Sequence, residues 1–208
     1  MARIDLGAAA SGDTDLITKK VTRGWMAQCK NGEYTRTPGV VPATLVDVTD
    51  GMMYGTLIVP ARNCTVDIIG FNLAAVGGTG SVVRLGIYTI TFASDGAMSA
   101  SLLVDAGTVA TNSGTGVKTV TIGSPVDLKY GTPYMFVLAS QGVPATKPDV
   151  TFVQSSHMGM SASTSAIALS TTGQFGWQVA SVTGALGSTP TFVTAVSSLP
   201  LMAFHCSA

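Results

Sequence analysis

The residues best suited to chemistry are few and widely spaced in this chain. Its 208 residues contain two histidines, His157 and His205, without an HExxH motif. His157 and Met160 stand three positions apart and could bind a soft metal together, but a protein metal site usually needs three or four ligands. We therefore interpret His157 as a solvated loop residue and expect neither a metal nor another cofactor.

Motifs for catalysis are also missing from the sequence. A GxSxG nucleophile motif is absent, and the acids are ten scattered Asp and a single Glu, Glu33, with no spacing that suggests a catalytic pair. Residues 114–119 (GTGVKT) lack the Gly-Lys-Ser/Thr of a phosphate loop, and residues 47–51 (DVTDG) carry fewer acids than a calcium loop. We predict that the protein is not an enzyme.

Aromatic and sulfur residues leave two questions open. Tyr54, Tyr88, Tyr130 and Trp177 could form a sugar-stacking platform, although core or interface packing is their more common role. The three cysteines, Cys29, Cys64 and Cys206, form an odd set without CxxC spacing. Buried thiols in a reducing cytosol are the first interpretation, and a bridge between chains or from Cys29 to the rest of the chain is the alternative.

The composition favours a β-rich globular protein. Charged residues make up 11% of the chain, the net charge is zero and the mean hydropathy is +0.43. Glu and Lys, the common residues of exposed helix faces, are scarce, and the hydropathy is too high for intrinsic disorder. A neutral chain gives no electrostatic reason to expect a nucleic-acid partner or a membrane surface. Without a long apolar run or a signal peptide, we expect no membrane insertion and synthesis in the cytosol.

The charges divide the chain into two parts near residue 37. Ten of the 22 charged residues lie in residues 1–37, and the Pro-bearing segment 37–42 (TPGVVP) is typical of an extended linker. We predict an anchoring or oligomerisation arm over 1–37 and a β domain over 38–208. A stripe of side chains with four-residue spacing marks the arm and could pack on its own domain or on a neighbouring subunit. The candidate anchoring residues are Ile17, Val21, Trp25 and Cys29, together with Arg23.

After residue 43, short apolar segments alternate with turn sequences, which is typical of an antiparallel β-sandwich, and we predict a jelly-roll-like one. A change of phase after Ile68 suggests a β-bulge. Residues 155–173 are small and polar, so we predict a long surface loop with His157, Met158 and Met160 as its candidate distal residues. The predicted strands are 52–59, 64–73, 82–91, 102–110, 117–122, 134–140, 150–154, 175–182 and 201–205.

The low charge of the β domain indicates that neighbours cover part of its surface. Residues 38–208 carry only twelve charges, whereas a soluble monomer normally needs a charged exterior. We therefore expect a homo-oligomer, with a trimer as the expected form.

Seven segments along the chain supply turn glycines and alternating core positions. They are LIVP (57–60), IIGFN (68–72), VRLGIY (83–88), LVDAGTV (103–109), TGVK (115–118), GTPYMFVLASQG (131–142) and PLMAF (200–204). In their order and spacing, residues from about 38 to 208, about four-fifths of the chain, resemble the jelly-roll-like β-sandwich domain of bacteriophage tail fibres and related virion surface proteins.

The resemblance implies a virion protein made in the host cytoplasm, with other capsid or tail proteins as partners. Because the arm is short, it implies a short fibre or a decoration protein rather than a complete long fibre. The alternative is a receptor-binding tail-fibre tip module that recognises host surface glycans through loops such as 155–173. An enzyme such as a glycan depolymerase is a third hypothesis, which the missing acid pair and nucleophile disfavour.

Overall fold

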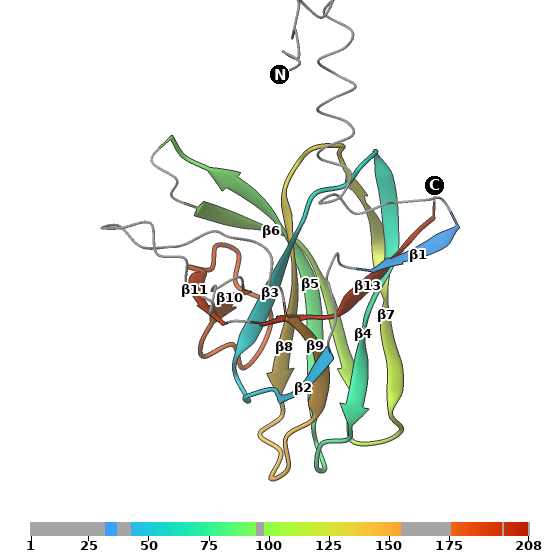
Figure 1. The fold of residues 1–208 in the computed structure, drawn as a ribbon, viewed down its shortest axis with the longest axis vertical. Coiled ribbons are helices and arrows are strands. Elements are labelled where there is room, and N and C mark those ends of the chain that lie inside the picture. The colour runs from blue at the N-terminus through green and yellow to red at the C-terminus, as the bar shows by residue number, and fades with distance from the viewer. Residues whose placement is uncertain (1–31, 37–42, 95–97, 155–175, 197, 208) are drawn as a thin grey trace, which may run out of the picture.

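The computed structural model describes residues 32–36, 43–94, 98–154, 176–196 and 198–207. In these residues it contains thirteen β-strands and no helix, and every strand pair is antiparallel (Figure 1). Two sheets pack face to face, so the predicted all-β sandwich is confirmed. The jelly-roll connectivity stays a prediction. The described part holds no helix long and apolar enough to cross a membrane.

The first sheet is built around the long strand β4, which pairs with β13 and β9 on one side and with β7 on the other. Its strands are β1 (Glu33–Arg36), β2 (Ala43–Asp47), β4 (Cys64–Ala75), β7 (Gly116–Leu128), β9 (Asp149–Gln154), β12 (Ser198–Pro200) and β13 (Met202–Cys206).

The second sheet has the order β11-β10-β3-β8-β5-β6, with β3 and β8 at its centre. Its strands are β3 (Met53–Ile58), β5 (Val82–Phe92), β6 (Met98–Ala110), β8 (Tyr134–Gln141), β10 (Gly176–Val179) and β11 (Val193–Val196).

The main core lies between the sheets and follows the two-residue period of the strands. Alternate residues of β4 and β5, such as Phe71 and Leu85, are buried there. Phe136 of β8 and Phe204 of β13 meet across the layer with ring centroids 5.0 Å apart. Burying an apolar side chain of this size contributes about 1.5–3 kcal/mol. This contact between distant parts of the chain therefore holds the layers together.

A second core covers the opposite face of the second sheet. Tyr88, Met135 and Val137 pack there with Leu186, which belongs to the irregular segment 180–192. We call residues 180–192 the strap. Because β8 is buried on both faces, all eight of its residues are buried, and its sequence YMFVLASQ shows no apolar-polar alternation.

The nine predicted strands are present, and most of their boundaries lie within two residues of the prediction; the larger differences are the start of β6, the end of β7 and the end of β10. The predicted bulge in β4 is confirmed, because the register with β7 shifts between Val66 and Ile68. Four short strands were not predicted: β1, β2, β11 and β12. One of them bears on the domain boundary. Residues 33–36, which the charge pattern assigns to the arm, form β1 and pair with β13, so the sheet begins before the linker.

Several candidate residues lie outside the described part of the chain. These are the anchoring residues Ile17, Val21, Arg23, Trp25 and Cys29 and the distal-loop residues His157, Met158 and Met160. Their predicted roles stay predictions. Of the cysteines, Cys64 and Cys206 are described and are buried thiols, as the first interpretation expects.

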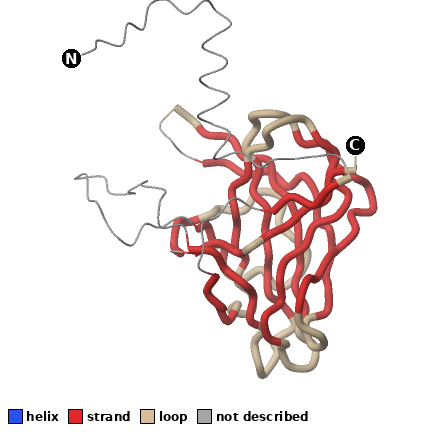
Figure 2. Tube along the Cα trace, turned by 45° about the vertical axis from the view of Figure 1, so that its right-hand side comes forward, coloured by secondary structure: helices blue, strands red, loops and turns tan. Residues whose placement is uncertain are grey.

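The described termini and a group of loops occupy opposite ends of the sandwich. The N–H of Gly32 donates a hydrogen bond of 2.6 Å to the carbonyl of Cys206, so the first described residue lies beside the last strand. Figure 2 shows loops gathered at the far end of the molecule from the C-terminus. The molecule therefore has a terminal end and a loop end.

Candidate functional site

The loop end is the most distinctive surface among the described residues. We define it as the four loops 48–52, 76–81, 111–115 and 142–148, which connect strands of both sheets. Connections between strands carry binding residues more often than the strands themselves, because the rigid sheets hold them in place.

Hydrogen bonds join these loops to one another. The N–H of Gly77 donates to the carbonyl of Thr111 over 2.9 Å, and the N–H of Gly78 donates to the carbonyl of Thr146 over 2.7 Å. The hydroxyls of Ser81 and Thr111 lie 2.6 Å apart and are buried. Three loops distant in sequence are thus fixed to each other, so the surface at this end is held in one shape.

Val143 is the exposed and strained point of the loop end. Its φ is 45° and it is 82% exposed. A β-branched residue rarely adopts a left-handed backbone, and the following residue, Pro144, disfavours it further. The carboxylate of Asp50 accepts a hydrogen bond of 3.1 Å from the N–H of Val143 and holds this conformation. A strained exposed side chain of this kind is a recognised sign of a binding surface.

The preceding glycine explains how the loop reaches this shape. Gly142 has a φ of 99° and packs so closely against the carbonyl of Gly80 that a Cβ at this position would overlap it. Only glycine fits such an approach. The sequence QGVP at 141–144 predicts a turn here, but nothing in it predicts the contact with Gly80 or the orientation of Val143.

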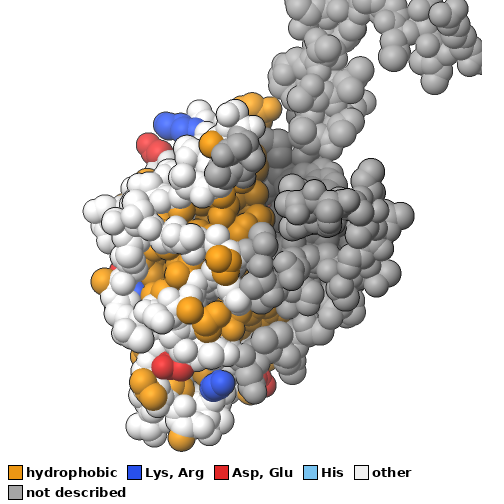
Figure 3. Space-filling model, turned by 90° about the vertical axis from the view of Figure 1, so that its left-hand side faces the viewer, with side chains coloured by type: hydrophobic (Ala, Val, Ile, Leu, Met, Phe, Trp, Pro, Cys, Tyr) orange, Lys and Arg blue, Asp and Glu red, His pale blue; other side chains and the backbone are white. Residues whose placement is uncertain are grey.

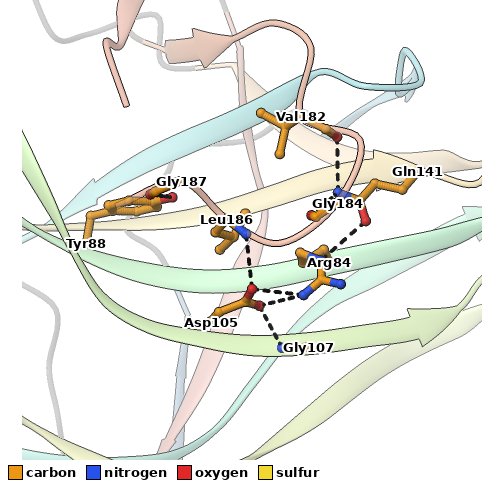
Figure 4. Close-up of polar contacts among 9 residues, drawn as sticks. All are labelled: Arg84, Tyr88, Asp105, Gly107, Gln141, Val182, Gly184, Leu186 and Gly187. Carbon is orange, nitrogen blue, oxygen red and sulfur yellow. Dashed lines mark hydrogen bonds and ion pairs between the residues drawn. The ribbon is translucent and has the colours of Figure 1, made fainter. Parts of the chain in front are cut away.

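A second polar cluster fastens the strap to the second sheet and is shown in Figure 4. Nη1 of Arg84 donates to both carboxylate oxygens of Asp105, over 3.0 and 2.8 Å. The same carboxylate accepts from the N–H of Gly107 and from the N–H of Leu186, each over 3.1 Å. Gln141 donates through Nε2 to the carbonyls of Val182 and Gly184, over 3.0 and 2.7 Å.

Tyr88 completes the attachment of the strap. Its hydroxyl donates to the carbonyl of Gly187 over 2.9 Å, and its ring packs edge-on against Phe192 with centroids 5.7 Å apart. Burial, together with the nearby negative charge of Asp105, raises the pKa of Tyr88 from 10.0 to about 12. This cluster joins the strap to three strands, and its polar side chains bind one another or the backbone. We interpret it as structural.

The described histidine, cysteine and acidic side chains, which could serve catalysis or bind a metal, do not come together in one site. His205 lies on the first sheet, with Nδ1 2.7 Å from Oδ1 of Asp67. No group of three or more His, Cys, Asp or Glu side chains among the described residues could hold a metal ion.

The aromatic residues do not form a sugar-stacking platform. Tyr54 belongs to the main core, Tyr88 to the second core, and Trp177 packs against the second core. Tyr130 is 49% exposed. Core packing, the more common role, is thus confirmed for the first three. The four described loops of the loop end contain no aromatic residue.

Hydrophobic side chains also gather on the outer side of the second sheet, as Figure 3 shows. The residues at this face include the half-buried Leu57, Met98 and Trp177 beside the second core. Such a face is often shared with a neighbouring chain.

The chain matches no known protein-family model, and no curated protein matches it.

Proposed function

We propose that this chain is a non-enzymatic structural protein of a bacteriophage virion, exposed as a short fibre or as a capsid or tail decoration protein. It is made in the host cytoplasm and anchored to other virion proteins by its N-terminal arm. The observation that supports this most is the separation of the described termini from the loop end. A protein held at one end and presenting the other needs this arrangement.

Low charge supports a homo-oligomer on the particle, with a trimer as the form expected from composition. The described β domain has few charged side chains, and two of them, Arg84 and Asp105, neutralise each other. An exterior of this kind suits a protein that is partly covered by neighbours.

The test is to locate the protein on particles of the phage that encodes it. Antibodies against the recombinant chain should label intact particles in electron micrographs, and mass spectrometry of purified particles should find many copies. A chain that is abundant in infected cells but absent from purified particles would contradict the proposal.

Anchoring by the arm has its own test, and the structure sets its boundary. A deletion of residues 1–31 removes most of the arm and keeps β1, whereas a deletion that extends to residue 36 would also remove an edge strand of the first sheet. The shorter deletion should fold and fail to join particles that lack the native protein. Normal incorporation of this variant would show that another part of the chain anchors it.

A second candidate function is a receptor-binding module at a fibre tip that recognises a host surface glycan. The observation that favours a binding role is the strained and exposed Val143 on the rigid loop end. Labelled protein should then bind host cells, and Val143→Asp should reduce binding while the fold is kept. Unchanged binding by this variant would exclude the loop end as the receptor site. A glycan array then tests whether the receptor is a sugar.

A further inference from the structure

One edge of strand β7 pairs with no other strand of the described chain, and this free edge is unusually long. The strand has 13 residues and pairs only with β4 among the strands of the described chain. Four other outer strands, β1, β2, β11 and β12, have three to five residues. Natural proteins keep exposed edges short because a row of free N–H and C=O groups invites another strand to pair.

The other long edge, β6, is interrupted along its length, whereas β7 is irregular only over residues 122–125, which include Pro125 and face a single residue of β4. Register shifts interrupt β6 at two places, and bulges of this kind disfavour strand addition. In contrast, residues 116–121 of β7 pair with residues 68–73 of β4 without interruption. This segment, GVKTVT, contains no proline and is rich in β-branched residues.

Alternate side chains along this segment are exposed to solvent. Val117 is 73% exposed, and Thr119 and Thr121 are exposed on the same face of the sheet. Lys118, the only charged residue between 116 and 121, directs its amine back to the carbonyl of Ser113 over 2.7 Å. The lysine that would normally discourage pairing is therefore turned away from the middle of the segment.

We propose that residues 117–121 of β7 pair antiparallel with the same residues of a second copy of this chain, about a two-fold axis at Thr119. This register places Val117 of one copy opposite Thr121 of the other, and Thr119 opposite Thr119. Pairs of β-branched residues across an antiparallel ladder stabilise it. The segment is self-complementary, as a two-fold contact requires.

The charges on this flank allow two copies to meet. β6 and β7 lie beside each other at the edges of the two sheets, and their 26 residues include three charged ones: Asp105, Lys118 and Asp127. Asp105 is paired with Arg84, and Asp127 accepts a hydrogen bond of 2.7 Å from the hydroxyl of Thr65. The third charge, the amine of Lys118, is held at the carbonyl of Ser113, beyond the end of the segment, so it lies away from the axis and opposes association little.

The size of the flank also fits a dimer. Because β7 runs along ten residues of β4, 64–73, at about 3.3 Å each, it is roughly 33 Å long, and sheets about 10 Å apart with side chains on their outer faces give a width of roughly 20 Å. The product, roughly 660 Å², lies within the range of about 600–1,000 Å² that each partner buries in a stable interface.

This contact does not depend on the proposed virion function, because it follows from the edge of β7 alone. It does set the symmetry of the assembly. A trimer with only a three-fold axis cannot contain a two-fold contact, so a β7 pair gives a dimer or, combined with a trimer, a hexamer.

Cysteine cross-linking tests the register directly. In a Cys29→Ser background, Thr119→Cys should form a disulfide-linked dimer on mild oxidation, since directly opposed residues have Cβ atoms about 5 Å apart. Val117→Cys alone should cross-link poorly, and a mixture of Val117→Cys and Thr121→Cys chains should cross-link well. Thr79→Cys, at an exposed turn of the loop end, is the matched control.

A charge variant provides an independent readout. Full-length protein should sediment as a dimer or hexamer, and Thr119→Lys should weaken the β7 contact by at least about tenfold in Kd, because it opposes like charges at the axis. Thr79→Lys adds the same charge elsewhere and should change nothing. A wild-type chain that stays monomeric or purely trimeric, or a Thr119→Cys variant that cross-links no better than Thr79→Cys, would overturn the proposal.

Discussion

Arg84 and Asp105 face each other across β5 and β6, and the carboxylate that binds the guanidinium also accepts the N–H of Leu186. A single aspartate thus connects two strands of the second sheet to the strap. Both side chains are 21% exposed, so the pair is largely shielded from water. The strap covers the outer face of the second sheet, and this junction holds the strap in place.

Replacing Asp105 with Asn should detach the strap from the sheet. The amide cannot neutralise Arg84 and accepts fewer of the four hydrogen bonds now made to the carboxylate. We expect a loss of about 2 kcal/mol in the free energy of unfolding, measured by urea denaturation. Asp127→Asn is the control, because that exposed side chain holds one threonine hydroxyl and should change stability by less than about 0.5 kcal/mol. Equal effects of the two variants would contradict the role given to Asp105.

The structure leaves no room for a side chain at Gly86. A Cβ at this position would overlap Leu186 and lie 2.8 Å from the carbonyl of Val104. We expect Gly86→Ala to lower stability by about 2 kcal/mol, since overpacking a tight core costs about 1–3 kcal/mol. Adding Leu186→Ala should recover part of this loss, because the carbonyl contact remains. A double-mutant cycle showing strict additivity would argue against the contact between these residues.

Stability should fall at high pH because of Tyr88. Its pKa is raised from 10.0 to about 12, so the folded state keeps the phenolic proton that the unfolded chain loses above pH 10. Its contribution is fully present below pH 10 and is lost as the pH rises towards 12, by up to about 2 kcal/mol. Tyr88→Phe should flatten this decline, measured by denaturation at several pH values. Tyr130→Phe, at a 49% exposed position, should leave the decline as in the wild type.

Relaxing the strained backbone at Val143 should stabilise the fold. Glycine adopts a φ of 45° without the steric cost that valine meets there. Since glycine also adds entropy to the unfolded chain, we expect a net gain of about 0.5–1 kcal/mol for Val143→Gly by thermal or urea unfolding. Val76→Gly, at a 40% exposed position of the same loop end without a left-handed backbone, should give no gain. A loss of stability in Val143→Gly would mean that the valine side chain makes contacts worth more than the strain.

Alternation was enough to predict the long strands, and the bulge in β4 could be predicted from the change of phase at Ile68. The boundary between the arm and the β domain was harder to predict from the sequence. β1 is a four-residue edge strand that exists because β13, at the other end of the chain, pairs with it, and no local pattern encodes that pairing. The strap could not be predicted either, because its Gly-, Ser- and Thr-rich sequence is typical of a surface loop.

The candidate site, too, could be predicted only in part, because its geometry depends on contacts between distant segments. The turn at 141–144 can be predicted from the sequence, but its shape depends on Gly80, which packs against Gly142, and on Asp50, which binds the N–H of Val143. Both residues come from other loops. Likewise, Arg84 and Asp105 are 21 positions apart, and only the bulged register of β5 and β6 brings them together. The virion setting and the trimer stay predictions.

The position of β13 has a consequence for how this protein is made. β13 lies inside the first sheet, between β1 and β4, and the strap that covers the second sheet comes shortly before it in the chain. Both layers are thus completed by residues that the ribosome synthesises after the long strands β4 to β8. Until they emerge, β4 lacks a neighbour and Tyr88 and Met135 face water, so the nascent chain should need protection from premature association and should pack its two layers only after β13 has been synthesised.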